Sequence, residues 1–269
     1  MSRLQPWFAS VLSLLLLGLP LWLVVATAGK SQSEALTPDL SPPSSWQLLP
    51  NLGQVWTEGR VPSALLGSLL IVVPTVLIAL VVGSMAAWVL ARRSSRLIAV
   101  CYAFAISGIV LPPAVVTVVL LLRQLGLAGT AVGMIGVYLG IYLSTVIFFV
   151  TGFVRTIPTS IEEAARIDGA GPMLVFRRVV LPMLRPVLAT VTILVCLYVW
   201  NDVFYAFFVV GGRMDTLPLN LFQVASAGLY LNNWHLIFAY VALMSVPLVV
   251  VLAVAQRQLI SGITSGAVK

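Results

Sequence analysis

Residues 156–186 read TIPTSIEEAARIDGAGPMLVFRRVVLPMLRP and form a polar stretch between two long apolar segments. Three acidic residues and four arginines fall within it, although only 9% of the whole chain is charged. Ser160 followed by Glu163 matches the capping-box pattern that begins a helix. Thr159 and Glu162 offer the same pattern one residue earlier. The stretch therefore carries its own signal for a helix start.

The second half of the stretch carries the signals for a turn and another helix. Gly169 can adopt the left-handed conformation that ends a helix, and Pro172 suits the first turn of the next one. Leu181-Pro182 is expected to end that second helix, because proline has no backbone N–H to donate. We predict two short helices, the first over 160–168, joined by a glycine turn at a membrane surface.

The composition makes a lipid bilayer the solvent of this protein. Of the 269 residues 60% are hydrophobic, and the mean hydropathy is +1.08. The predicted fold class is an all-α polytopic membrane protein with six transmembrane helices. These spans are expected at 7–28, 63–91, 97–122, 130–154, 187–210 and 234–255. A cleaved signal peptide is the alternative for the first of them.

Basic residues give the predicted orientation. Eleven of the 15 Lys and Arg residues lie on the side that holds 156–186, and four lie on the other side. The positive-inside rule then places this stretch and both termini in the cytoplasm. The proline-broken segment 29–62 falls outside, either as an irregular loop or as a surface that touches an extracytoplasmic partner.

Two features of the apolar spans stand out. Pro112 and Pro113 interrupt the third span, where they predict a kink that is either structural or lines a translocation path. Along the fourth span, glycines at three- and four-residue spacing predict a face for close helix packing. These glycines are Gly129, Gly133, Gly136 and Gly140.

Few residues in the sequence offer chemistry. Asp202, which follows Asn201, is the one acidic residue inside a predicted span. Such a carboxylate either bonds to a neighbouring helix or water, or lines a cavity. The sequence has no Ser/His/Asp set, no metal-ligand cluster, no GxxxxGK[ST] loop and no basic patch interleaved with aromatic residues. We therefore expect no catalytic residues, no metal and no nucleic-acid partner.

The polar stretch resembles a known family. Glu163-Ala164-Ala165, then Asp168-Gly169-Ala170 and Leu181-Pro182, closely resemble the EAA loop of ABC-importer membrane subunits, in the form typical of carbohydrate uptake. Further matches are Leu111-Pro112-Pro113, Trp200-Asn201-Asp202 and the tail 262–269.

The resemblance implies one of two different permease subunits in a bacterial inner membrane, working with a pair of cytoplasmic ATPases and an external solute-binding protein. ATP and Mg would be bound by the ATPases, with no cofactor on this chain. The residues implied in ATPase coupling are Glu162, Glu163, Ala164, Ala165, Asp168, Gly169, Ala170, Leu181 and Pro182. Those implied in the translocation path are Pro112, Pro113, Asn201 and Asp202.

The implied organisation has three parts. Residues 1–62 hold the first span and an extracytoplasmic loop, 63–258 form a five-helix permease core with the coupling loop at 155–186, and 259–269 form a cytoplasmic tail. The alternative function is an ion-coupled secondary transporter that uses Asp202 as its coupling carboxylate. That class predicts internal inverted repeats, and we find no repeat between the halves.

Overall fold

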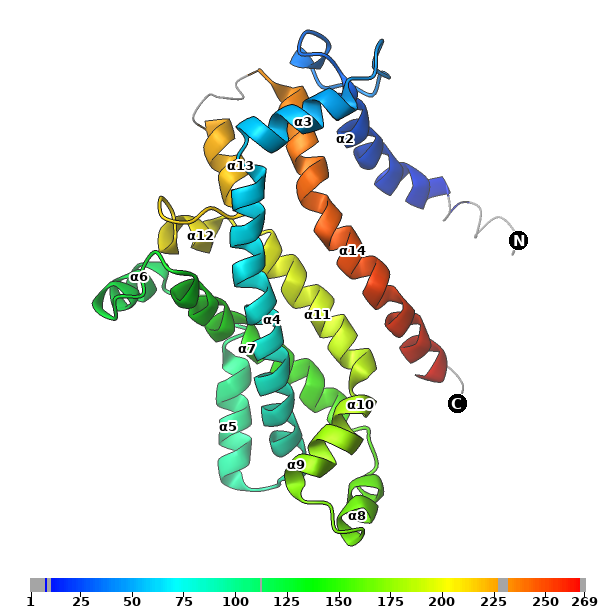
Figure 1. Cartoon of the computed structure of the whole chain (residues 1–269). Coiled ribbons are helices and arrows are strands. Elements are labelled where there is room, and N and C mark those ends of the chain that lie inside the picture. The colour runs from blue at the N-terminus through cyan, green and yellow to red at the C-terminus, as the bar shows by residue number, and fades with distance from the viewer. Residues whose placement is uncertain (1–7, 9–10, 112, 227–231, 267–269) are drawn as a thin grey trace. The chain divides into compact units, whose positions relative to one another are not determined.

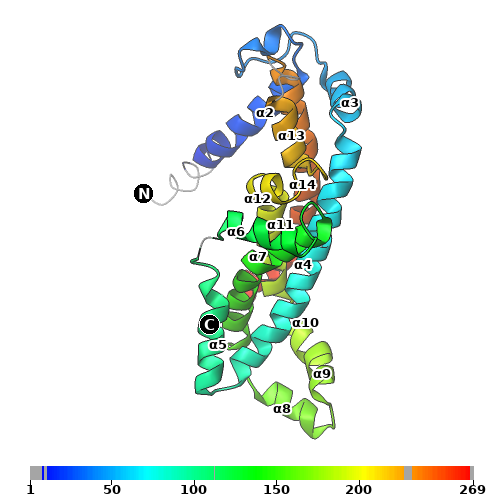
Figure 2. The same ribbon diagram turned by 90° about the vertical axis from the view of Figure 1, so that its left-hand side faces the viewer.

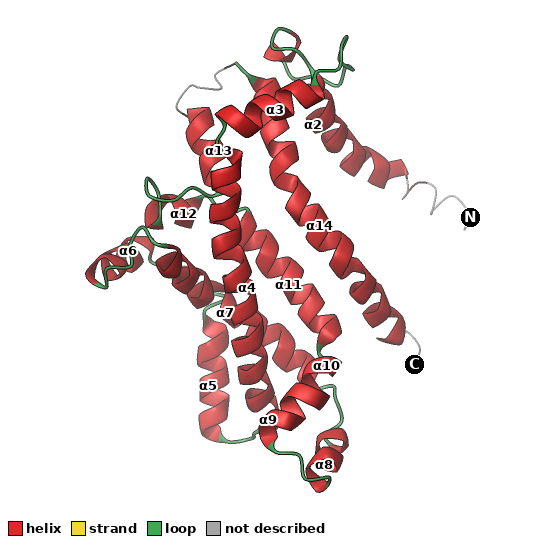
Figure 3. Cartoon of the chain, in the orientation of Figure 1, coloured by secondary structure: helices red, strands yellow, loops and turns green. Residues whose placement is uncertain are grey.

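The computed structural model describes residues 8, 11–111, 113–226 and 232–266, with side chains described as far as Val254. Within these ranges every regular element is a helix, as predicted for an all-α protein (Figure 3). The helices are α2 (Leu19–Gly29), α3 (Leu48–Glu58), α4 (Val61–Arg92), α5 (Arg96–Ser107), α6 (Val115–Gln124), α7 (Ala131–Val154), α8 (Ser160–Ile167), α9 (Pro172–Val175), α10 (Leu181–Met183), α11 (Arg185–Trp200), α12 (Phe204–Val209), α13 (Leu217–Ser226) and α14 (Trp234–Gly266). π-Helical segments lie at Leu14–Gly18 and Phe176–Val180, and a 3-10 turn lies at Glu34–Leu36.

Four helical stretches of the described chain are long and apolar enough to cross a membrane, namely Val11–Gly29, Val61–Arg92, Ala131–Val154 and Trp234–Val254. The pair Pro172–Met183 and Arg185–Trp200 makes a fifth if it is counted as one span, although it is bent by 75°. The protein is therefore a multi-pass membrane protein. The count of six spans and the position of the termini stay predictions.

The predicted third span is not one helix. α5 ends at Ser107 and α6 begins at Val115, so the chain is broken where the sequence predicted only a kink. Pro113 lies in this break, and Pro112 falls outside the described residues. Gly108 starts the break close to α7, since a Cβ there would come within 2.3 Å of the Ser144 hydroxyl. Pro112 and Pro113 have no N–H to donate to residues 108 and 109, which explains why the helix does not continue across this segment.

The predicted fifth span, 187–210, is also divided. α11 ends at Trp200 and α12 begins at Phe204. The Asp202 carboxylate accepts hydrogen bonds from the backbone N–H groups of Tyr205 and Ala206, at 3.3 and 3.0 Å. An acidic side chain that caps free N–H groups favours the start of a new helix over continuation of the old one.

The chain divides into two compact units. The first is Met1–Leu66 with Asp215–Pro247, and the second is Gly67–Met214 with Leu248–Lys269. The long helices α4 and α14 each contribute to both units. The boundary in α14 coincides with Pro247, a proline inside the helix.

In the first unit the segment 29–62 is an ordered structure and not the irregular loop that one interpretation of the sequence expected. It contains α3, which the sequence analysis missed because Pro50 was taken as a helix breaker; Pro50 lies in the first turn, where proline is tolerated. The buried Asn51 amide donates to the carbonyls of Ala28 and Lys30 at the end of α2, at 2.8 and 2.9 Å. Gly29 lies against the Trp46 ring, where a Cβ would come within 2.6 Å.

The second unit is built around α7, which packs against α5 and α11. α4 also approaches α7 closely, because a Cβ on Gly83 would lie 2.6 Å from Val146. The predicted glycine face is only partly in close contact: a Cβ on Gly133 would lie 2.3 Å from the Leu127 carbonyl oxygen and one on Gly129 would lie 2.3 Å from the Arg213 side chain, whereas Gly136 and Gly140 have open space there. α8 and α9 lie next to the lower ends of α4 and α5, as both Figure 1 and Figure 2 show.

Candidate functional site

The polar stretch folds as α8, a turn, and the segment from α9 to α10. Neither predicted capping box forms: Thr159 is the N-cap, and no side chain there bonds to the backbone. The N–H groups of Glu162 and Glu163 instead bond to the Thr159 carbonyl at 3.0 Å. Both carboxylates are therefore available for other contacts. Among the described residues only the Glu162 carboxylate makes hydrogen bonds.

Glu162 ties α8 to the end of α4. Its side chain is 3% exposed and accepts hydrogen bonds from the Trp88 indole N–H at 3.0 Å and from Arg92 Nε at 2.7 Å. Arg92 also donates to the Ile157 carbonyl, just before α8, at 2.9 Å. Arg166, one turn along α8, lies 3.6 Å from the same carboxylate. A charge-assisted cluster of this kind holds two helix ends in a fixed relation.

The Trp88 side chain extends this connection to the next segment. Its ring packs on Phe176 of the π-helical segment, with ring centroids 5.5 Å apart. Trp88 thus contacts both arms of the polar stretch, and the end of α4 is clamped between α8 and the helix that follows it. An open cavity of about 500 Å³ lies here, lined in part by Arg93, Thr159 and Glu163.

On α8 the side chains of Ile161 and Ala164 are exposed, whereas Glu163 is exposed at the edge of the cavity beside α4. Ile161 is 39% exposed and Ala165 is half-buried. Small and apolar side chains are thus exposed on part of the helix surface, while Glu162 is buried against α4. The Glu163 carboxylate has no hydrogen bond or ion pair among the described residues, so it is free to meet a basic group.

The turn after α8 depends on Gly169, which has φ of +86°. Its N–H bonds to the Arg166 carbonyl and the Ala170 N–H bonds to the Ala165 carbonyl, both at 3.0 Å. These two bonds make the Schellman motif that closes a helix end with a left-handed glycine. Asp168, which the sequence analysis grouped with these residues, is the exposed C-cap.

Leu181-Pro182 does not end the second helix, contrary to the sequence prediction. The preceding turn widens into a π-helix, in which the Leu181 N–H bonds to the Phe176 carbonyl. The helix then continues through Pro182 to Met183, and the chain bends by 75° at Leu184. Pro186 in the first turn of α11 explains the position of the bend, because its ring would clash with a continuous helix before it.

A second cluster gathers around Asp202. Its carboxylate accepts a hydrogen bond from the Tyr138 hydroxyl at 2.8 Å in addition to its two backbone bonds. The next rings along are Tyr142 and Tyr198, which stack with centroids 5.5 Å apart and planes within 5°. Sequence reasoning missed these tyrosines; their spacing of four residues from Tyr138 to Tyr142 on one helix was the available signal.

The other residues implied in the translocation path are less closely joined. Asn201 is exposed and donates its amide to the Leu197 carbonyl within its own helix at 2.9 Å. Pro113 is half-buried, and no described hydrogen bond joins its segment to Asn201 or Asp202. Across the described residues, no group of three or more His, Cys, Asp or Glu side chains is placed to hold a metal ion.

Comparison with known proteins adds to this geometry. The sequence model of the family described as binding-protein-dependent transport system inner membrane component matches residues 79–265. The chain is 34% identical over 226 residues to a melibiose/raffinose/stachyose import permease of Bacillus subtilis, covering 81% of this chain and 80% of that protein. It is 30% identical to a diacetylchitobiose uptake permease of Streptomyces coelicolor, over 92% of this chain and 82% of the other.

A third relative is a trehalose transport permease of Mycobacterium tuberculosis, 32% identical over 77% of each chain. Among solved structures, one chain of a bacterial ABC transporter that imports the acidic polysaccharide alginate superposes with a TM-score of 0.77. The match covers 96% of this chain and 98% of the other at 21% identity, so it shows a shared fold.

Proposed function

This chain belongs to the family of binding-protein-dependent transport system inner membrane components, and from that premise we propose that it forms part of a membrane pathway for a sugar, driven by a partner ATPase through α8. The chain is a permease subunit of an ABC importer. Sugar as the solute is supported by the names of the three relatives above, each of which takes up a small carbohydrate. Nothing in the comparisons favours the ion-coupled alternative.

The observation that carries the proposal is the two-sided character of α8. One side is fixed to α4 through Glu162, Arg92 and Trp88, and another presents the exposed side chains of Ile161 and Ala164. The Glu163 carboxylate, which is unpaired among the described residues, lies at the edge of the cavity beside α4. A surface of small side chains lets the groove of another protein approach the helix backbone closely. We assign this face to the ATPase and Glu163 to a basic group in its groove.

The fixed side explains how movement would pass into the membrane. When the two ATPases close on ATP and Mg, which they bind and this chain does not, the docked α8 moves with them. The buried contact between Glu162 and Arg92 carries that movement to the end of α4, and Trp88 carries it to Phe176 beyond the turn. A buried, hydrogen-bonded ion pair suits this role because leaving one of its charges buried without its partner costs about 3–5 kcal/mol.

The pathway itself we place along α7 and α11, beside Asn201 and Asp202. Tyr198 is 52% exposed and stacks on Tyr142, which leaves an aromatic surface next to the exposed Asn201 amide. An aromatic face suits the apolar C–H face of a sugar ring, and an amide suits its hydroxyls. A second, different permease would supply the other wall, and an extracytoplasmic solute-binding protein would deliver the sugar.

The test uses the complete transport system purified in mild detergent through a tag on this chain. Ala164→Trp places a large ring on the exposed face of α8, and we expect it to abolish co-purification of the ATPase and sugar uptake. Leu97→Trp, a comparable change at an exposed position on α5, is the matched control and should retain both. Normal ATPase recovery with Ala164→Trp would refute the assignment of this face.

A further inference from the structure

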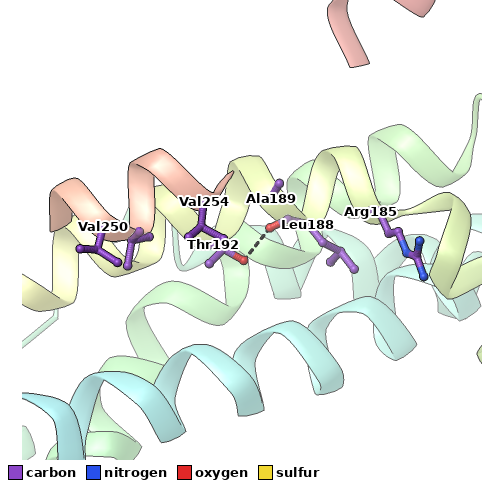
Figure 4. A pocket seen from close by; sticks show the side chains of 7 residues that line it. Arg185, Leu188, Ala189, Thr192, Val250 and Val254 are labelled. Carbon is purple, nitrogen blue, oxygen red and sulfur yellow. Dashed lines mark hydrogen bonds between the residues drawn. The ribbon is translucent and has the colours of Figure 1, made fainter. Parts of the chain in front are cut away.

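An open groove runs between α11 and the second half of α14, two segments of the same compact unit. It has a volume of about 420 Å³ and is lined by Leu188, Ala189 and Thr192 of α11 and by Val250, Val251 and Val254 of α14. Arg185 lies at one end of it, as Figure 4 shows. Neither the coupling of α8 nor the pathway beside Asp202 uses this groove.

Arg185 and Thr192 are the two polar residues that line the groove. The Thr192 hydroxyl donates to the Leu188 carbonyl of its own helix at 2.7 Å, drawn as the dashed line in Figure 4, so its hydrogen-bonding requirement is met. The Arg185 guanidinium is exposed and has no hydrogen bond or ion pair with another described residue. No acidic residue lines the groove. A fitting occupant has an anionic head and a long apolar body.

The length of the groove points to a lipid chain. A smaller cavity of about 130 Å³, lined by Ile193, Cys196 and Leu197 of α11 together with residues of α14, shares Val251 with the groove and continues it. The twelve steps from Arg185 to Leu197 rise about 18 Å along the helix. This is slightly more than half of the ~30 Å hydrocarbon core, which is the depth of one leaflet.

Charge favours an anionic lipid over a neutral one. Arg185 is positively charged, and the groove lining has no acidic residue to neutralise it. By the positive-inside rule this end of the groove meets the cytoplasmic leaflet, which carries anionic lipids. We propose that the groove holds one acyl chain of an anionic phospholipid, whose phosphate pairs with Arg185.

The experiment is native mass spectrometry of the full chain, equilibrated in detergent with dioleoyl phosphatidylglycerol or dioleoyl phosphatidylcholine. We expect the wild-type chain to retain phosphatidylglycerol in preference, and Arg185→Gln to retain it about fivefold less, as one basic group near an anionic lipid implies. Arg185→Lys should keep most of the preference. Arg178→Gln, a matched loss of charge outside the groove, should behave as wild type.

A second pair of variants tests the acyl chain separately from the head group. Val250→Trp fills the groove from an exposed position and should lower retention of both lipids, whereas Val246→Trp, equally exposed on the same helix but outside the groove lining, should not. Equal phosphatidylglycerol retention by Arg185→Gln and Arg178→Gln, or unchanged retention by Val250→Trp, would overturn the proposal. So would cross-linking of a Val250→Cys variant to a second permease, because the groove would then be a subunit interface.

Discussion

At the residue scale, two adjacent carboxylates in α8 have opposite surroundings. Glu162 is buried against α4 and meets Arg92 and Trp88, whereas Glu163 is exposed and unpaired among the described residues. A helix turns by about 100° per residue, so neighbours in the sequence face different directions. Glu162 therefore has a structural role within the chain, whereas Glu163 is available to bind a partner protein.

Replacing these two glutamates should separate the roles. Glu162→Gln leaves Arg92 without its counter-charge, and we expect it to lower the free energy of unfolding by about 3 kcal/mol, in keeping with a broken buried pair. Glu163→Gln should change stability by less than about 0.5 kcal/mol, as at an exposed site. Thermal denaturation in detergent measures both.

A compensating variant provides the control. Adding Arg92→Met to Glu162→Gln removes the unpaired charge and should recover part of the lost stability. Equal losses of unfolding free energy for Glu162→Gln and Glu163→Gln would show that the buried ion pair does not stabilise the fold.

The sequence contained the helix but not the partner of Glu162. Residues close in the chain predicted α8, its Gly169 turn and Pro172 at the start of α9, because those signals act within one or two turns. Trp88 and Arg92 lie about seventy residues earlier, and nothing local joins them to Glu162. The capping box of Thr159 and Glu162 was wrong for the same reason: the distant Arg92 offers Glu162 a stronger partner than a backbone N–H.

The hydrogen bonds of Asp202 predict how its replacement by asparagine affects transport. Its carboxylate caps α12 and accepts from Tyr138, and an asparagine oxygen can keep part of this set of bonds. Asp202→Asn should therefore reduce sugar uptake several-fold without abolishing it, with normal assembly of the transporter. Complete loss of uptake in a normally assembled complex would mean that the charge itself takes part in transport.

At the element scale, the Schellman turn after α8 sets the direction in which this helix points. Gly169→Val forces a β-branched residue into φ of +86°, so we expect the turn to rearrange and uptake to be lost while membrane insertion remains normal. Gly171→Ala is the matched control, because Gly171 has an ordinary φ and open space where a Cβ would go. Uptake retained by Gly169→Val would count against coupling through this turn.

The segment between α2 and α3 gives a prediction for pH. Hydrogen bonds from Ser44 and Ser31 lower the pKa of Glu34 to about 2, and bonds from Lys30 and Ser41 lower the pKa of Asp39 to about 2. A carboxyl whose pKa is lowered by folding stabilises the fold above its unfolded pKa, and this contribution is lost as the pH falls toward the folded value. The segment should therefore keep its structure from pH 7 to 5 and loosen progressively between about pH 4.5 and 2.

Tryptophan fluorescence measures this transition, because Trp46 packs on Gly29 within the same segment. The double variant Glu34→Gln, Asp39→Asn should show no such transition in this range. A transition near pH 6 in the wild-type chain would contradict the assignment to these two carboxyls.

Long, continuously apolar elements were predictable from the sequence, and broken ones were not. The boundaries of α4 and α7 lie within two residues of the predicted spans, because length and hydropathy alone decide such helices. The break between α5 and α6 and the one after α11 depend on tertiary contacts, those of Gly108 with Ser144 and of Asp202 with Tyr138. α3 was missed because the sequence alone does not show whether Pro50 ends a helix or lies in its first turn, where proline is tolerated.

At the scale of the whole molecule, much of the apolar surface is still uncovered. Gly136 and Gly140 on α7 have open space where a Cβ would go, and the side chains of Ile161 and Ala164 on α8 are exposed. A permease that works as one of several subunits presents such surfaces to the bilayer and to its partners. The coupling proposed here joins two of them, from an ATPase at α8 through Glu162 and α4 into the membrane.

Reconstitution of the purified complex in liposomes tests this account most directly, by measuring solute uptake with ATP on the ATPase side and with ion gradients collapsed by ionophores. We predict uptake that requires ATP, persists without any ion gradient and is lost with Ala164→Trp. Uptake by this chain alone, driven by an ion gradient and indifferent to ATP, would contradict it.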